Sequence, residues 1–197
     1  MNCQNNHKPD YVMKLIFSPD QITEALTYEL YPVIQDNSSE ITLGDQCSPE
    51  GFGPCAGTYH FKRGDEIRVD LICNVKTPDK LNQRPGINLD VKTFTIVSIG
   101  PNTQKYLSLF EKEHACITLT DWTELKPVRN KKNKDFISAI YESKDYMHVK
   151  AENGHWKMSG YLSVLIDVKH PGKKRERTAR LFYFDPEGTA GDGGIEP

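Results

Sequence analysis

The sequence predicts an all-β protein, an antiparallel sandwich of two sheets with one short helix after the first strand. Two segments, 67–75 and 161–169, alternate apolar and polar residues with the period of a half-buried strand. Fourteen glycines and twelve prolines divide the chain into short segments. Short strands separated by frequent turns favour a sandwich over βαβ units.

The chain opens with a predicted strand and a predicted helix. Tyr11–Phe17 is an apolar run of strand length. Residues 18–21 then read as a helix start, because a serine is followed by proline and, three residues on, by glutamine. Apolar residues recur every four positions at Ile22, Leu26 and Leu30. We expect a helix of about three turns that ends before Pro32.

The rest of the chain predicts strands joined by turns. The clearest turn is Arg63-Gly64-Asp65, directly before the alternating segment 67–75. Strands are predicted at 40–43, 67–75, 89–99, 106–110, Cys116–Leu119, 136–141, 146–150, 161–169 and 179–184. Residues 1–186 are expected to form a single domain, and 187–197 a flexible, acidic, glycine-rich tail.

Composition argues against several classes of partner. The net charge of the 197 residues is −2, so no global field draws the protein to nucleic acid or to an anionic membrane. The polar N-terminus lacks the apolar core of a secretory signal, and five irregularly spaced cysteines fit a reducing compartment. We expect a cytoplasmic protein, with secretion by a route without a signal peptide left open. Bridging of Cys47 and Cys55 is also left open.

No motif announces catalysis, a cofactor or a metal. The nearest to a nucleophile and base is His114 with Cys116, a spacing that also fits an edge histidine beside a core cysteine. Two basic clusters, within 126–134 and 169–177, lack the interleaved aromatics of an RNA reader and are expected to be solvated surface. We therefore predict no enzyme activity, no cofactor, no metal and no nucleic-acid partner.

The most site-like feature is a pair of tryptophans in polar surroundings. The predicted ligand-binding residues are Asp121, Trp122, Asn153, His155 and Trp156. Aromatic faces flanked by carboxylates and amides are typical of a sugar site, where the apolar face of the sugar stacks on the ring. The alternative is that each tryptophan caps the core at one end of the sandwich.

Three segments resemble the bacterial inclusion-body protein family of the AidA and PixA type. Residues 11–21 resemble the family's opening strand and turn, R-G-D-E-I-R at 63–68 its turn and strand, and L-F-Y-F-D-P at 181–186 its closing motif. The resemblance implies a β-sandwich made in the bacterial cytoplasm, which in some members accumulates as dense inclusions, and it supplies no established catalytic residues. It also implies glycan binding by some members.

These observations predict a non-enzymatic, self-associating β-sandwich, a homo-oligomer formed through exposed strand edges. Its loops are expected to bind carbohydrate. One alternative is a glycan-binding lectin that acts outside the producing cell. The other is an enzyme with dispersed site residues around His114 and Cys116.

Overall fold

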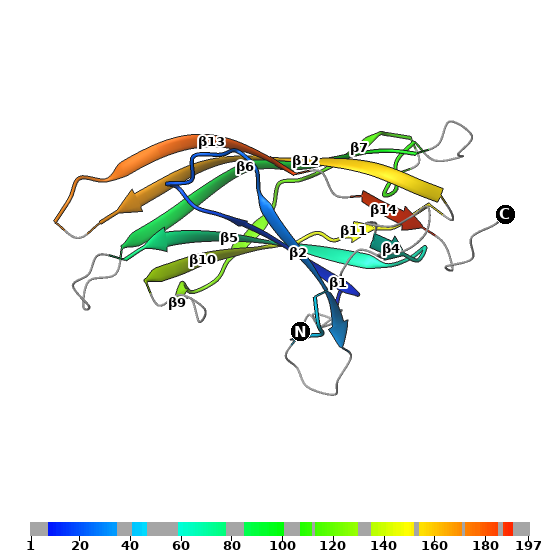
Figure 1. Ribbon diagram of the computed structural model, residues 1–197, viewed down its shortest axis with the longest axis horizontal. Helices are drawn as coiled ribbons and strands as arrows, with labels where there is room; N and C mark the ends of the chain where they lie inside the picture. The colour runs from blue at the N-terminus through cyan, green and yellow to red at the C-terminus, as the bar shows by residue number, and fades with distance from the viewer. Residues whose placement is uncertain are drawn as a thin grey trace, which may run out of the picture.

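The protein consists of strands and turns arranged in two sheets (Figure 1). The computed structural model describes residues 8–34, 41–46, 59–77, 85–100, 107–111, 113–129, 135–151, 154–170, 172–184 and 187–190. Within these ranges no residue is helical, so the prediction of an all-β protein with two sheets is confirmed. Nothing in the same ranges is a helix of the length and apolarity needed to cross a bilayer.

The larger sheet has eight strands, in the order β3-β2-β1-β5-β10-β8, with β11 paired to β5 and β9 paired to β10. Their bounds are β1 Tyr11–Phe17, β2 Thr27–Ile34, β3 Thr42–Leu43, β5 Glu66–Lys76, β8 Trp122–Glu124, β9 Val128–Arg129, β10 Phe136–Ser143 and β11 Met147–His148. Strands β1 and β5 run parallel, whereas the other pairs are antiparallel.

The smaller sheet has six strands, in the order β4-β14-β12-β6-β7, with β13 paired to β12. Their bounds are β4 Tyr59–Phe61, β6 Gly86–Ile99, β7 Cys116–Leu119, β12 Gly154–Lys169, β13 Glu176–Phe184 and β14 Glu187–Ala190. Strands β4 and β14 are parallel. The prediction that the sheets are wholly antiparallel is therefore wrong. Alternation of side chains reports which face of a strand is buried and carries no information on the direction of its neighbour.

The predicted helix after β1 is also wrong, although its start signal makes the expected hydrogen bond. The backbone N–H of Ser18 donates to Gln21 Oε1 at 2.9 Å, as in a capping box. Instead of a helix, the following backbone pairs with β13: Leu26 N–H donates to the Tyr183 carbonyl, and Tyr183 N–H donates to the Glu24 carbonyl. Tertiary pairing therefore overrides the local signal, and Ile22 is left 98% exposed.

Pro32 lies inside β2, where it was expected to end a helix. It stands opposite Tyr11 of β1, and the next residue, Val33, donates its N–H to the Asp10 carbonyl. The Tyr11–Pro32 pair is thus a non-hydrogen-bonded position of the ladder, at which β1 requires no N–H from residue 32. The proline is tolerated for that reason.

Three further segments differ from what was predicted for them. Residues 107–110 are not a strand, because Ser108 Oγ accepts hydrogen bonds from the N–H groups of Phe110 and Glu111 and closes a turn. In the predicted tail, β14 pairs with both β12 and β4, so chain packing does not stop at residue 186. Of the predicted segment 146–150, only β11 is a strand.

One hydrophobic core joins the inner faces of the two sheets. In Figure 1, β13, β12 and β6 form the upper layer, and β5 and β10 lie below them. Aromatic rings bridge the layers: Phe17 of β1 lies 5.0 Å from Phe182 of β13, measured between ring centroids. Within the upper layer, Phe94 stacks on Phe184 at 6.0 Å. The core therefore depends on close approach of large rings to the backbone.

Gly160 shows how tight that approach is, and it generates a prediction. A Cβ atom at Gly160 would lie 1.9 Å from the Phe184 ring, whereas at Gly86 the nearest atom is Lys169 Cβ at 3.8 Å. We expect Gly160→Ala to lower the free energy of unfolding by about 1–3 kcal/mol through overpacking. Gly86→Ala, the matched control, should change it by less than about 0.5 kcal/mol. Urea denaturation measures both, and equal effects would contradict the packing assigned to Phe184.

Candidate functional site

The structure does not support the predicted tryptophan platform. Trp156 is fully buried, and a Cβ at Gly100 would meet its ring at 2.4 Å. Trp122 is half-buried and makes an edge-to-face contact with Phe94 at 6.3 Å between centroids. The two rings belong to different sheets. The burial of Trp156 fits the alternative that the ring packs in the core, and it leaves no exposed face of that ring for a sugar.

The other predicted site residues do not assemble a site around these rings. Asp121 is exposed and forms an ion pair with Lys144, Oδ1 to Nζ 2.9 Å. His155 lies in β12, and only its backbone is described. Asn153, Cys47 and Cys55 lie outside the described residues. Among the described residues of the five, Asp121 and Trp122 are chain neighbours and so are His155 and Trp156, but the two pairs lie on different sheets.

His114 and Cys116 lie in an exposed position. Both are solvent-exposed, and β7 begins only at Cys116, so the expected strand geometry does not extend to the histidine. This pair lines neither the pocket beside Arg63 and Lys150 nor the one beside Pro19 and His170. The larger, of 580 Å³, is an open hollow with charged residues of both signs, among them an ion pair between Lys150 and Glu111. No group of three potential metal ligands occurs in the described ranges.

A row of charged residues crosses the outer face of the larger sheet. Glu29 of β2 stands opposite Lys14 of β1, Lys14 opposite Asp70 of β5, and Asp70 opposite Glu142 of β10. The signs along this row are negative, positive, negative, negative. Its last step places two carboxylates directly opposite each other, which is destabilising unless a cation lies between them.

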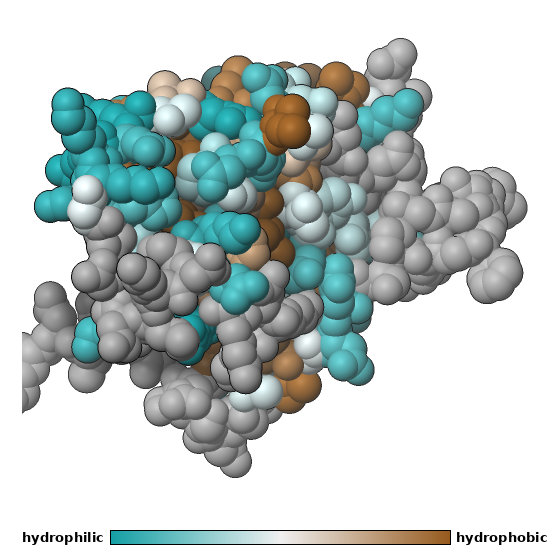
Figure 2. Space-filling view, turned by 60° about the vertical axis from the view of Figure 1, so that its left-hand side comes forward, coloured by the Kyte–Doolittle hydropathy of each residue, from teal (hydrophilic) through white to brown (hydrophobic). Residues whose placement is uncertain are grey.

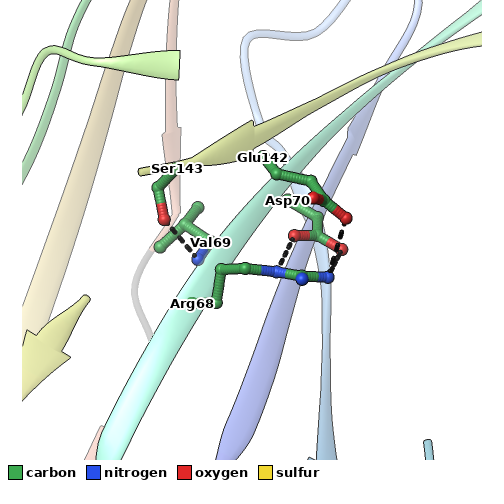
Figure 3. Close-up of polar contacts among 5 residues, drawn as sticks. All are labelled: Arg68, Val69, Asp70, Glu142 and Ser143. Atoms are coloured by element: carbon green, nitrogen blue, oxygen red, sulfur yellow. Dashed lines mark hydrogen bonds and ion pairs between the residues drawn. The ribbon is translucent and has the colours of Figure 1, made fainter. Parts of the chain in front are cut away.

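Arg68 supplies that cation (Figure 3). Its Nε and Nη2 donate to the two carboxylate oxygens of Asp70 at 2.8 and 3.0 Å, and Nη2 also lies 2.9 Å from Glu142 Oε1. Next to this contact, the backbone N–H of Val69 in β5 donates a hydrogen bond to Ser143 Oγ in β10 at 3.0 Å. One guanidinium therefore joins β5 to β10 through planar, charge-assisted hydrogen bonds.

Burial dominates the electrostatics of this cluster. It raises the pKa of Asp70 above its ordinary value, against the opposing effects of Arg68 and Lys14. Burial also raises the pKa of Glu142, with Arg68 opposing and Asp70 reinforcing the shift. Burial is also the largest cause of the raised pKa of Tyr146. The charged groups of Arg68, Asp70 and Glu142 bind one another, so we interpret the cluster as a structural clamp between β5 and β10. Sequence reasoning missed it, although an arginine and an aspartate two apart in a strand share a face.

The feature with functional potential is the free edge of the smaller sheet at β7. This strand pairs with β6 on one side. Because Ser98 N–H donates to the Ala115 carbonyl, the Val97–Cys116 pair is a non-hydrogen-bonded one. The N–H and C=O groups of Cys116 and Thr118 therefore point away from β6, and within the described residues no partner reaches them.

Two other edge segments of the smaller sheet, on β13 and β6, make hydrogen bonds to other parts of the chain. Residues 24–26 pair with the far side of β13, and Arg180 Nη2 donates to the carbonyl of Gln21 at 3.0 Å, which holds this segment in place. Along the half of β6 beyond the reach of β7, the N–H of Leu89 donates to the hydroxyl of Tyr141 at 3.1 Å. This contrast with β7 makes its edge the candidate interaction site.

An uncharged face continues from that edge across the sheet. One cross-strand row runs from Tyr183 through Tyr161 and Thr95 to Thr118, and both tyrosines are nearly half exposed. Thr95 and Thr118 join their hydroxyls at 2.9 Å. On the neighbouring row, Leu181 is 56% exposed. Brown and pale atoms accordingly interrupt the teal along the upper surface in Figure 2.

Comparison with known proteins found no match for this chain among family models, curated proteins or solved structures. The resemblance to the inclusion-body family therefore stays a prediction that rests on its three sequence segments.

The clamp generates a stability prediction. The side chains of Arg68 and Asp70 are only 11% and 7% exposed, so Arg68→Met leaves two opposed carboxylates with little water. We expect the free energy of unfolding to fall by about 3–5 kcal/mol. Adding Asp70→Asn and Glu142→Gln to Arg68→Met should restore most of it. A loss below about 1 kcal/mol in the single variant, as for an exposed ion pair, would contradict the clamp.

The raised pKa of Glu142 predicts a pH dependence. A carboxyl whose pKa is higher in the folded than in the unfolded state contributes stability that is complete below its unfolded pKa and is lost as pH rises through its folded pKa. Between neutral pH and the ordinary glutamate pKa of 4.5, Glu142 should therefore favour folding increasingly as pH falls. Glu142→Gln should flatten this part of the stability profile, measured by urea unfolding at successive pH values. A steeper profile in the variant would show that the pKa is lowered instead.

Proposed function

We propose that this chain is a non-enzymatic, self-associating two-sheet sandwich protein of the inclusion-body type, and that its copies join through the open edge at β7. The observation that carries the proposal is the outward direction of the N–H and C=O groups of Cys116 and Thr118. Unpaired backbone groups at a sheet edge are a template for another strand. In this proposal the protein acts by assembling, in the cytoplasm.

The composition of β7 supports pairing. Soluble proteins block their edge strands with charged residues, prolines or bulges, or by covering them. The strand Cys116–Leu119 has the sequence C-I-T-L, without charge or proline, and its register with β6 is regular. Its outward-facing side chains, Cys116 and Thr118, are small and exposed. A second strand can therefore approach without burying a charge.

Glycan binding, the other candidate, has less support from the described residues. Trp156 is buried and is lost as a stacking surface. Tyr161 and Tyr183 are exposed, but they lie on the outer face of a sheet, and neither lines the two pockets described above. Sugar sites usually combine an aromatic ring with a concave, convergent set of polar groups. We therefore rank self-association first.

Replacing Thr118 by proline tests the proposal. The Thr118 N–H points outward, so Thr118→Pro removes a donor from the free edge and leaves the β6 ladder intact. We expect the variant to be folded and to shift from oligomer to monomer in multi-angle light scattering. Thr118→Val, which keeps the N–H, should remain oligomeric.

Ile117→Pro is the matched control, because it removes a backbone N–H that points toward β6 instead of one that points outward. The Ile117 N–H lies on the β6 side, so its loss should lower the thermal stability. Wild-type protein that scatters as a strict monomer at high concentration would refute self-association. If Thr118→Pro remains oligomeric, the contact between copies must lie on a surface other than the β7 edge.

A further inference from the structure

We infer that two copies of the chain pair their β7 strands antiparallel, about a two-fold axis that passes beside Ile117. This inference rests on the proposed self-association and adds the partner strand, the register and the symmetry. The resulting contact is isologous, meaning that the same surface is used by both subunits.

The hydrogen-bonding pattern of β7 restricts the possible registers. Residues with outward N–H and C=O groups alternate along the strand, and Cys116 and Thr118 are the two within its bounds. In an antiparallel ladder, two such residues placed opposite each other exchange both of their N–H···O bonds. With the axis beside Ile117, Cys116 faces Thr118 of the partner subunit, and Thr118 faces Cys116 of the partner subunit.

Two neighbouring registers satisfy the same alternation and pair fewer strand residues. An axis at Cys116 would put Thr118 opposite His114 of the partner subunit, and His114 precedes the strand. An axis at Thr118 would put Cys116 opposite Thr120 of the partner subunit, beyond the strand end. Only the axis beside Ile117 gives each outward residue of β7 a partner that is also in β7.

The remaining edges of the sheet indicate that this association closes at two subunits. The far side of β13 is occupied by residues 24–26 and held by Arg180. The terminal strand β4 has three residues, of which Tyr59 and Phe61 are buried, whereas Cys116 and Thr118 of β7 are exposed. A two-fold contact that uses β7 consumes the open edge in both copies, so it yields a dimer in place of a growing fibre.

The dimer would also enlarge the uncharged face described above. Thr118 ends the row that contains Thr95 and Tyr161, and in the pair it lies beside Cys116 of the partner subunit. Both residues are on the outer side of the sheet. The two uncharged faces thus become one continuous surface.

Cysteine crosslinking tests the register, because Cys116 is a native, exposed free thiol. In the inferred dimer, Thr118→Cys lies opposite Cys116 of the partner subunit, at the Cα separation of about 5.5 Å of a hydrogen-bonded pair. That distance is within the range that a disulfide bridges. We expect T118C, under mild oxidation, to convert to a covalent dimer on a non-reducing gel, whereas wild type and the double variant C116S/T118C stay monomeric there.

Each other result has a definite reading. Wild-type dimers that disappear with Cys116→Ser would place the axis at Cys116, and crosslinking of C116S/T118C would place it at Thr118. Either result overturns the inferred register. If light scattering shows dimers but T118C does not crosslink, the copies join elsewhere, and self-association survives without this inference. If scattering shows a monomer, both fail.

Discussion

The guanidinium of Arg68 is the interaction on which the larger sheet depends. It lies on β5, the strand that connects the parallel partner β1 to the antiparallel partner β10, and it separates the facing carboxylates of Asp70 and Glu142. A slip of one residue along β5 would turn these charges into the core. The clamp therefore fixes the register of the strands as much as it stabilises them. With this register, alternate apolar side chains of β1, β5 and β10 face the core.

The edges of the smaller sheet differ in how far they are covered, and this difference links the fold to the proposed function. The strand β13 is covered by backbone from the other end of the chain, and β6 is capped by a tyrosine hydroxyl from the opposite sheet. By contrast, the described residues leave β7 without such a cover. Covering an edge removes its hydrogen-bonding groups from competition, so the uncovered edge at β7 is available to a partner.

Sequence patterns predicted the strands well where alternation was long. The bounds of β1 and β7 were predicted to the residue, and β5, β10 and β12 were found with shorter limits. The Ser18–Gln21 signal failed because pairing of Leu26 with Tyr183 lies outside any local window. The sequence left open whether Trp156 is buried, because polar chain neighbours say little about which face of a strand faces the core. The sequence indicated that association would use an exposed strand edge but not which strand, because strand order decides which strand lies at the edge.

The bridge between residues 24–26 and Tyr183 has a consequence for how the chain acquires its structure. Leu26 donates to the carbonyl of Tyr183, and Arg180 binds Gln21 across a separation of 159 positions. During synthesis on the ribosome, residues 21–26 cannot make these bonds until residue 183 has emerged. Folds dominated by such distant pairings form slowly, and strands without their neighbours are prone to associate meanwhile.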